Sequence, residues 1–144
     1  ENLDVDAIAL LVRNTNQSSL QLAAAILSGN TPKALSLVFE LLASSEPALR
    51  IAATLVGQFR TWLWVKLMVE SGERNPQVTA QAAEVANPNR IYFLQQEVKQ
   101  VSLEQLLSTL PILLELEVSL KQGADNISAL QTKVIQLSEL CKRS

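Results

Sequence analysis

The chain has 144 residues, with 12 lysine and arginine residues against 14 aspartate and glutamate residues, one cysteine and no histidine. The lack of histidine excludes Ser-His-Asp triads, Cys-His pairs and His-containing zinc sites, and a single cysteine excludes an internal disulfide and a four-thiolate metal cluster. A formal net charge of −2 argues against a broad basic face for nucleic acid, so the composition favours a scaffold or interaction module over an enzyme.

The beginning of the chain predicts a short helix that precedes the main domain. Asn2 would cap a helix from Leu3 to Arg13, and the polar run at 14–17 is typical of a linker. The chain begins without a methionine or a signal-peptide pattern, which favours an excerpt of a larger protein. We therefore expect residues 1–16 to be the tail of a preceding domain with its linker, and residues 17–144 to form one helical domain.

Glycine and proline turns divide the following segment into helices. Gly29 fits a left-handed C-terminal cap, and Thr31 fits the N-cap of the next helix, with Pro32 at its first position. The longest helix is expected from Glu46 to Ser71. The short loops between these three helices predict that they pack as neighbours.

Two Asn-Pro pairs and a capping box predict the remaining helices. Ser102 and Gln105 form the capping box, in which each side chain bonds the backbone N–H of the other residue. Pro111 lies inside the helix that follows and predicts a kink at about 107–111, because a proline leaves a carbonyl of the preceding turn without a donor. The expected helices lie near 76–85, 88–101, 103–122 and 126–142. The prediction is therefore all-α: a compact bundle of about seven or eight helices with no sheet.

Residue pairs with catalytic potential are absent or weak. The sequence contains no phosphate-binding loop, zinc motif or nucleophile elbow. Glu115 and Glu117 lie about 200° apart around a helix, so they do not form one site. Glu117 and Lys121, four residues apart, predict a surface ion pair instead. We expect a non-catalytic chain with no metal and no cofactor.

The segment 76–101 has the order of a helix-turn-helix, which makes a DNA-binding module an alternative to weigh. Its second helix carries only Arg90 and Lys99 as cations. The apolar stripe of that helix, which we expect to be buried, comprises Ile91, Leu94 and Val98. An ordinary helical corner is therefore the favoured interpretation.

The surface feature of most interest is the segment 58–69, which holds both tryptophans of the chain. Trp62 and Trp64 lie about 200° apart on the helix, so either several helices surround the segment or one tryptophan faces a partner. Arg60 shares a face with Trp64, and Lys66 with Trp62, so either pair could stack. Tryptophan and arginine dominate interface hot spots, and these four residues form the candidate partner interface.

The order of these elements resembles the C-terminal part of the bacterial DNA polymerase III delta subunit family, a clamp-loader family. The resemblance covers residues 18–142. The matching residues are Lys33, Ala34 and Leu35, the helix start at Glu46 and Pro47, the Gln58 to Arg60 segment, and the acidic-x-x-Leu-Lys-x-Gly element at Glu117, Leu120, Lys121 and Gly123.

The resemblance implies that residues 17–144 are the helical collar of a clamp-loader subunit, and that residues 1–16 are the tail of a preceding lid-like domain with its linker. Its partners would be the collars of the delta-prime and gamma/tau subunits, in a ring that loads the sliding clamp during DNA replication. The clamp would be gripped by an N-terminal domain outside this chain, DNA would be met only indirectly in the assembled loader, and the protein would be cytoplasmic with no membrane contact. The alternative is a stand-alone helical adaptor that binds some other helix.

Overall fold

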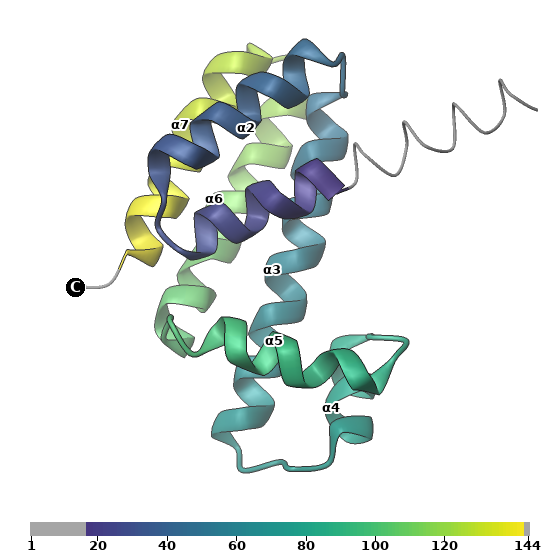
Figure 1. The fold of residues 1–144 in the computed structure, drawn as a ribbon. Coiled ribbons are helices and arrows are strands. Elements are labelled where there is room, and N and C mark those ends of the chain that lie inside the picture. Colours follow the sequence, from purple (N-terminus) through teal and green to yellow (C-terminus); the bar gives the residue numbers. More distant parts are fainter. Residues whose placement is uncertain (1–16, 143–144) are drawn as a thin grey trace, which may run out of the picture.

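The computed structural model describes residues 17–142, and within them all regular secondary structure is helical (Figure 1). The described part of the first helix covers residues 17–27. It is followed by α2 (Thr31–Ala43), α3 (Ala48–Glu70), α4 (Pro76–Ala83), the short 3-10 helix η1 (Pro88–Arg90), α5 (Ile91–Val98), α6 (Leu103–Lys121) and α7 (Asn126–Cys141). The predicted all-α class is confirmed. The helix expected at 3–13 lies outside the described residues.

Local capping signals explain where the helices begin. The Asn30 side chain caps α2 by accepting from the Lys33 N–H at 3.3 Å, so the predicted cap at Thr31 was one residue late. The capping box is confirmed, because the Ser102 N–H donates to the Gln105 side chain at 2.8 Å and the Gln105 N–H donates to Ser102 Oγ at 3.0 Å.

Left-handed residues end several helices, and one of these residues is not a glycine. Gly29, Gly72 and Gly123 all have positive φ, at +73°, +89° and +90°, as a left-handed C-terminal turn requires. Glu84 ends α4 in the same left-handed region with φ of 59°, one residue after the helix, whereas the sequence predicted α4 to continue to residue 85.

Pro111 does not divide its helix. α6 is one α-helix from Leu103 to Lys121, with Pro111 on an exposed position inside it. The exposed position leaves the unbonded carbonyl of the preceding turn close to solvent, which lowers the cost of the proline. The bend expected at 107–111 stays a prediction.

α3 is the central element of the packing. It packs against α6, α4 and α5, while α7 packs against both α6 and α2. Figure 1 shows α2 and α7 side by side next to one half of α3, and α4 and α5 packed against the other half. The largest fully buried side chains are Trp62, Phe59, Leu22, Ile26, Leu27, Ile51, Leu55, Ile91, Leu94, Leu106, Leu113 and Leu116. One core therefore runs along α3 and joins the two halves.

In the part of the chain that the structure describes, no helix is both long and apolar enough to cross a bilayer.

Candidate interaction surface

The two tryptophans of α3 have opposite environments. Trp62 is 1% exposed and packs edge-on against Phe59, with the ring centroids 5.0 Å apart. Phe59 and Trp62 are one helical turn apart on the side of α3 that faces the core. Trp62 is covered by helices of its own chain, so its predicted role as a direct partner contact is wrong. Trp64 lies on the outer side and keeps 41% of its surface exposed.

Trp64 belongs to a continuous outer face of α3. We define the α3 face as the exposed residues Leu49, Ala53, Gly57, Arg60, Trp64 and Leu67. They recur every three or four residues and so form one stripe, about 27 Å long at 1.5 Å per residue. A side-chain carbon placed on Gly57 would meet nothing within 4 Å, so the space above the middle of the face is open. An apolar face of this length with one charged residue can receive a helix of a partner.

Sequence reasoning found only the C-terminal half of this face. Polar residues in the N-terminal half of α3, such as Thr54 and Gln58, interrupt the apolar pattern there. The signal that was available is the four-residue spacing of Leu49, Ala53 and Gly57, because small and apolar residues repeated at that interval share one side of a helix.

The two cations near the tryptophans have different roles, and neither predicted stacking contact forms. Arg60 donates to the Glu84 carboxylate at 3.3 Å, with both side chains more than half exposed, so this ion pair contributes little stability. Lys66 donates from Nζ to the backbone carbonyl of Val98 at 3.2 Å, in the last turn of α5. A cation at the C-terminal end of α5 complements the helix dipole, so the Lys66 contact stabilises the packing of α5 on α3.

The carboxylate of Glu97 lies in the same contact between α3 and α5. Burial raises the pKa of Glu97, while the Trp62 indole and the Arg90 guanidinium act in the opposite direction. The indole N–H itself is buried and has no partner within hydrogen-bonding geometry among the described residues. Glu97 is therefore a half-buried acid of α5 whose charged form is poorly solvated.

The acidic-x-x-Leu-Lys-x-Gly element on α6 has a structural role at its glycine. Gly123 takes the left-handed turn that ends α6. The predicted pair of Glu117 with Lys121 is not among the ion pairs of residues 17–142, and Glu115 instead binds Lys133 of α7 at 2.7 Å. A pair four residues apart on one helix contributes only a few tenths of a kcal/mol, which is too little to order two long side chains.

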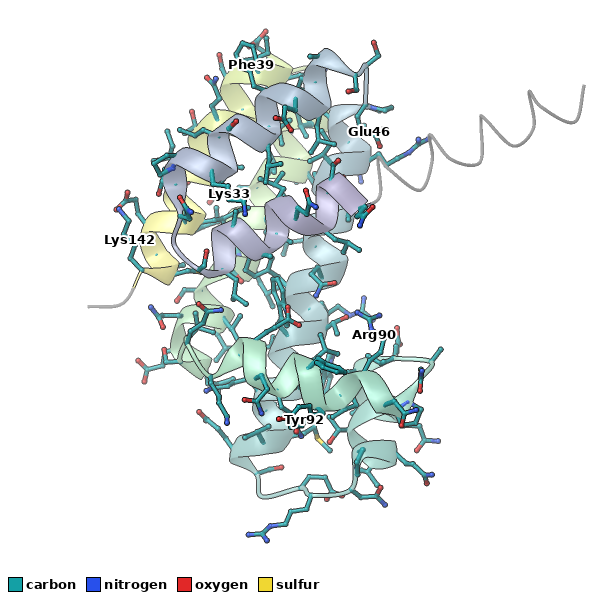
Figure 2. The ribbon with its side chains drawn as sticks, in the orientation of Figure 1. Lys33, Phe39, Glu46, Arg90, Tyr92 and Lys142 are labelled. Carbon is teal, nitrogen blue, oxygen red and sulfur yellow. The ribbon has the colours of Figure 1, made fainter. Side chains whose placement is uncertain are left out.

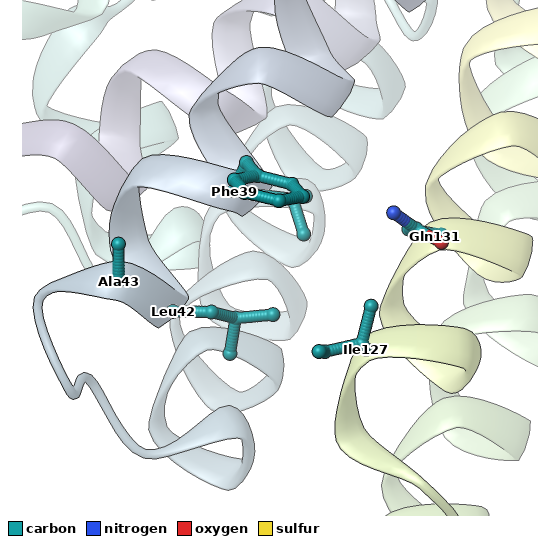
Figure 3. A pocket seen from close by; sticks show the side chains of 6 residues that line it. Phe39, Leu42, Ala43, Ile127 and Gln131 are labelled. Carbon is teal, nitrogen blue, oxygen red and sulfur yellow. The ribbon is translucent and has the colours of Figure 1, made fainter.

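An apolar hollow opens between α2 and α7 (Figure 3). Phe39, Leu42 and Ile127 line it, and its volume is about 210 Å³. Ile127 is 49% exposed because it faces this hollow. Figure 2 shows that Phe39 and Tyr92, which are 66% and 62% exposed, lie at opposite ends of the molecule. The hollow has no titratable side chain in its lining and suits an apolar group.

No group of three or more histidine, cysteine, aspartate or glutamate side chains within residues 17–142 is placed to hold a metal ion. The helical corner at α4 and α5 buries Ile91, Leu94 and Val98 as predicted. Exposed apolar faces such as that of α3 are the kind of surface that receives partner proteins.

A comparison with protein families tests the resemblance to the clamp-loader family. The family model described as DNA polymerase III delta subunit, C-terminal domain, matches residues 16–137. The chain belongs to this family. The resemblance inferred from the sequence is therefore confirmed, and the matched range of this delta C-terminal domain includes the whole α3 face and α6.

A solved structure supports the same assignment. The delta C-terminal domain is similar to the Bacillus subtilis DNA clamp loader delta protein, with 25% sequence identity and a TM-score of 0.76. The similarity covers 93% of this chain and 40% of that protein, so the chain spans less than half the length of its solved relative. No curated protein matches the sequence.

Proposed function

We propose that this delta C-terminal domain is a non-catalytic collar, residues 17–144, that assembles a clamp-loader ring for DNA replication. Residues 1–16 would join it to a preceding domain. Its partners would be the helical collars of the delta-prime and gamma/tau subunits, in the cytoplasm. The sliding clamp would be contacted by another domain of the same subunit, and DNA only through the assembled loader.

The observation that carries the proposal is the α3 face in a domain of this family. The face presents Trp64 and Leu67 beside Arg60, and its centre at Gly57 is open. Aromatic and arginine residues around an open apolar centre are the residue types that dominate protein interfaces. The adaptor alternative uses the same face, but it does not explain why the chain matches a clamp-loader family.

The test is binding of the chain to purified gamma/tau and delta-prime collars. We expect a complex that co-elutes in size-exclusion chromatography, and we expect Trp64→Ala to weaken binding by roughly 30-fold, as for a hot-spot residue worth about 2 kcal/mol. Isothermal titration calorimetry measures the dissociation constants of the unmodified chain and of Trp64→Ala. No complex at tens of micromolar would contradict the proposal.

Phe39→Ala is the matched control, because Phe39 is also an exposed aromatic residue but lies on α2. It should bind as the unmodified chain does. If Phe39→Ala weakens binding and Trp64→Ala does not, then the hollow between α2 and α7 is the interface and the α3 face is not.

A further inference from the structure

A second apolar face lies on the outer side of α6. We define the α6 face as Leu107, Pro111, Leu114 and Val118, which are all exposed. They are spaced by four, three and four residues and therefore lie within about 60° of one another around the helix. The residues that α6 buries lie on its other side, and they are Leu106, Thr109, Leu113, Leu116 and Leu120. No helix of the described chain covers the α6 face.

Opposite charges stand at the two ends of this face. Glu104 is in the first turn of α6, three residues before Leu107, and Lys121 is in the last turn, three residues after Val118. Both side chains are exposed, and neither is in an ion pair within residues 17–142. An antiparallel helix with the usual acid at its start and cation at its end would bring opposite charges to both ends. A parallel helix would bring like charges together.

A shallow hollow lies beside the α6 face. Pro111, Leu114 and Val118 line this hollow, and the ion pair between Glu115 and Lys133 closes it on the side of α7. The hollow can take a side chain of a helix that lies along α6. Its polar edge resembles the rim of a protein interface, where ion pairs surround an apolar centre.

The size of the face indicates what kind of partner fits. Four side chains that are about half exposed bury far less than the roughly 1,200–2,000 Å² of a stable complex. A partner on the α6 face therefore needs a second point of attachment. The proposed ring would supply this second attachment, because head-to-tail assembly in a closed ring uses two different faces of every subunit. α3 and α6 pack against each other, so their outer faces look in different directions.

We infer that the α6 face receives an antiparallel helix from a neighbouring clamp-loader subunit, other than the neighbour that occupies the α3 face. This inference rests on the proposed function. The partner helix has an apolar stripe, a cation that meets Glu104 and an acid that meets Lys121.

The experiment measures binding of the chain to the gamma/tau collar and to the delta-prime collar in separate titrations. We expect Leu114→Glu to weaken binding to one collar by at least tenfold and Trp64→Ala to weaken binding to the other. Lys121→Glu, which leaves the apolar stripe intact, should weaken the same complex as Leu114→Glu. Ile135→Glu is the matched control, because Ile135 is an exposed apolar residue of α7 that lies on the side away from Lys133. Circular dichroism verifies that each variant is folded.

The outcomes separate the two ideas. If the unmodified chain binds neither collar, the proposed function fails and this inference fails with it. If the unmodified chain binds the collars and Leu114→Glu binds each of them as tightly as the unmodified chain does, only the inference on the α6 face is overturned. If sedimentation shows that the unmodified chain dimerises and Leu114→Glu does not, the occupant is a second copy of the chain and the inference is again wrong.

Discussion

At the scale of single residues, Gly29 has the least room for a side chain among the four glycines. Its φ of +73° is in the left-handed region, and a side-chain carbon added there would lie 2.8 Å from Cγ and 3.0 Å from Cα of Lys142. The turn after the first helix thus lies against the end of α7. Gly72 has a similar φ of +89°, but an added carbon would meet nothing within 4 Å. Substitutions at the two glycines therefore separate the cost of a left-handed backbone from the cost of a close contact with Lys142.

We therefore predict that Gly29→Ala is more destabilising than Gly72→Ala. Gly72→Ala should lower the free energy of unfolding by about 1–2 kcal/mol, the cost of a left-handed alanine. Gly29→Ala should lose about 1–3 kcal/mol more, because the backbone of Lys142 must move. Urea denaturation followed by circular dichroism measures both values. Equal losses would show that the end of α7 gives way without cost.

At the scale of helices, Gln105 ties two of them together. Its side-chain oxygen accepts from the Ser102 N–H at the start of α6, and its Nε2 donates to the carbonyls of Leu140 and Lys142 at the end of α7, at 3.0 and 3.3 Å. One amide therefore satisfies a donor at one helix start and acceptors at another helix end. Helix ends always leave such groups unpaired, so this arrangement fixes the ends of α6 and α7 against each other.

Gln105→Glu tests the link between the helices without removing the cap. Glutamate keeps the acceptor of the capping box but has no donor for the two carbonyls of α7, and its charge repels them. We expect a loss of about 1–2 kcal/mol in the free energy of unfolding. Amide hydrogen exchange should become faster in the last turn of α7, while the first turn of α6 should change less. Gln105→Ala, which removes both functions, should speed exchange at both helix ends. Unchanged exchange in α7 on Gln105→Glu would contradict the proposed link.

At the scale of the whole molecule, the single core includes the only cysteine of the chain. Cys141 is 2% exposed at the end of α7, and burial raises the pKa of its thiol to about 11. Because the thiolate is the reactive form, both burial and the raised pKa protect this residue from thiol reagents. The thiol is accessible only when α7 leaves the core, so its reactivity measures the opening of the fold.

We predict that Cys141 reacts with Ellman's reagent at pH 8 at least a hundredfold more slowly in the folded chain than in urea. Absorbance at 412 nm follows the reaction. Because the thiol pKa is raised on folding, this group stabilises the fold at pH values below the unfolded pKa, and the stabilisation is lost as the pH rises toward 11. A folded chain that reacts as fast as the unfolded one would show that the end of α7 is open in solution.

Much of the fold follows from the sequence because its signals are local. Glycines at helix ends, prolines near helix starts and the Ser102–Gln105 capping box act over four residues or fewer, and they place most helix ends within about three residues. The helix expected at 88–101 is instead the 3-10 helix η1 followed by α5, which ends at Val98, and the longest helix begins at Ala48 rather than at Glu46. The errors at Thr31 and Glu84 are one or two residues at a helix end, where neighbouring cap residues compete. The order of such motifs also indicated the delta C-terminal domain family, which the family model confirms.

What only the tertiary structure decided is which of two helix faces is covered. Periodicity places Trp62 and Trp64 on opposite sides of α3, but it does not say which side meets the core, because the helices that cover Trp62 come from distant parts of the chain. For the same reason Lys66 finds its acceptor on α5, and Glu115 finds Lys133 on α7, 18 residues away. By itself the sequence determined an all-helical domain of a clamp-loader family. The packing of its helices determined that the α3 and α6 faces remain open to partners.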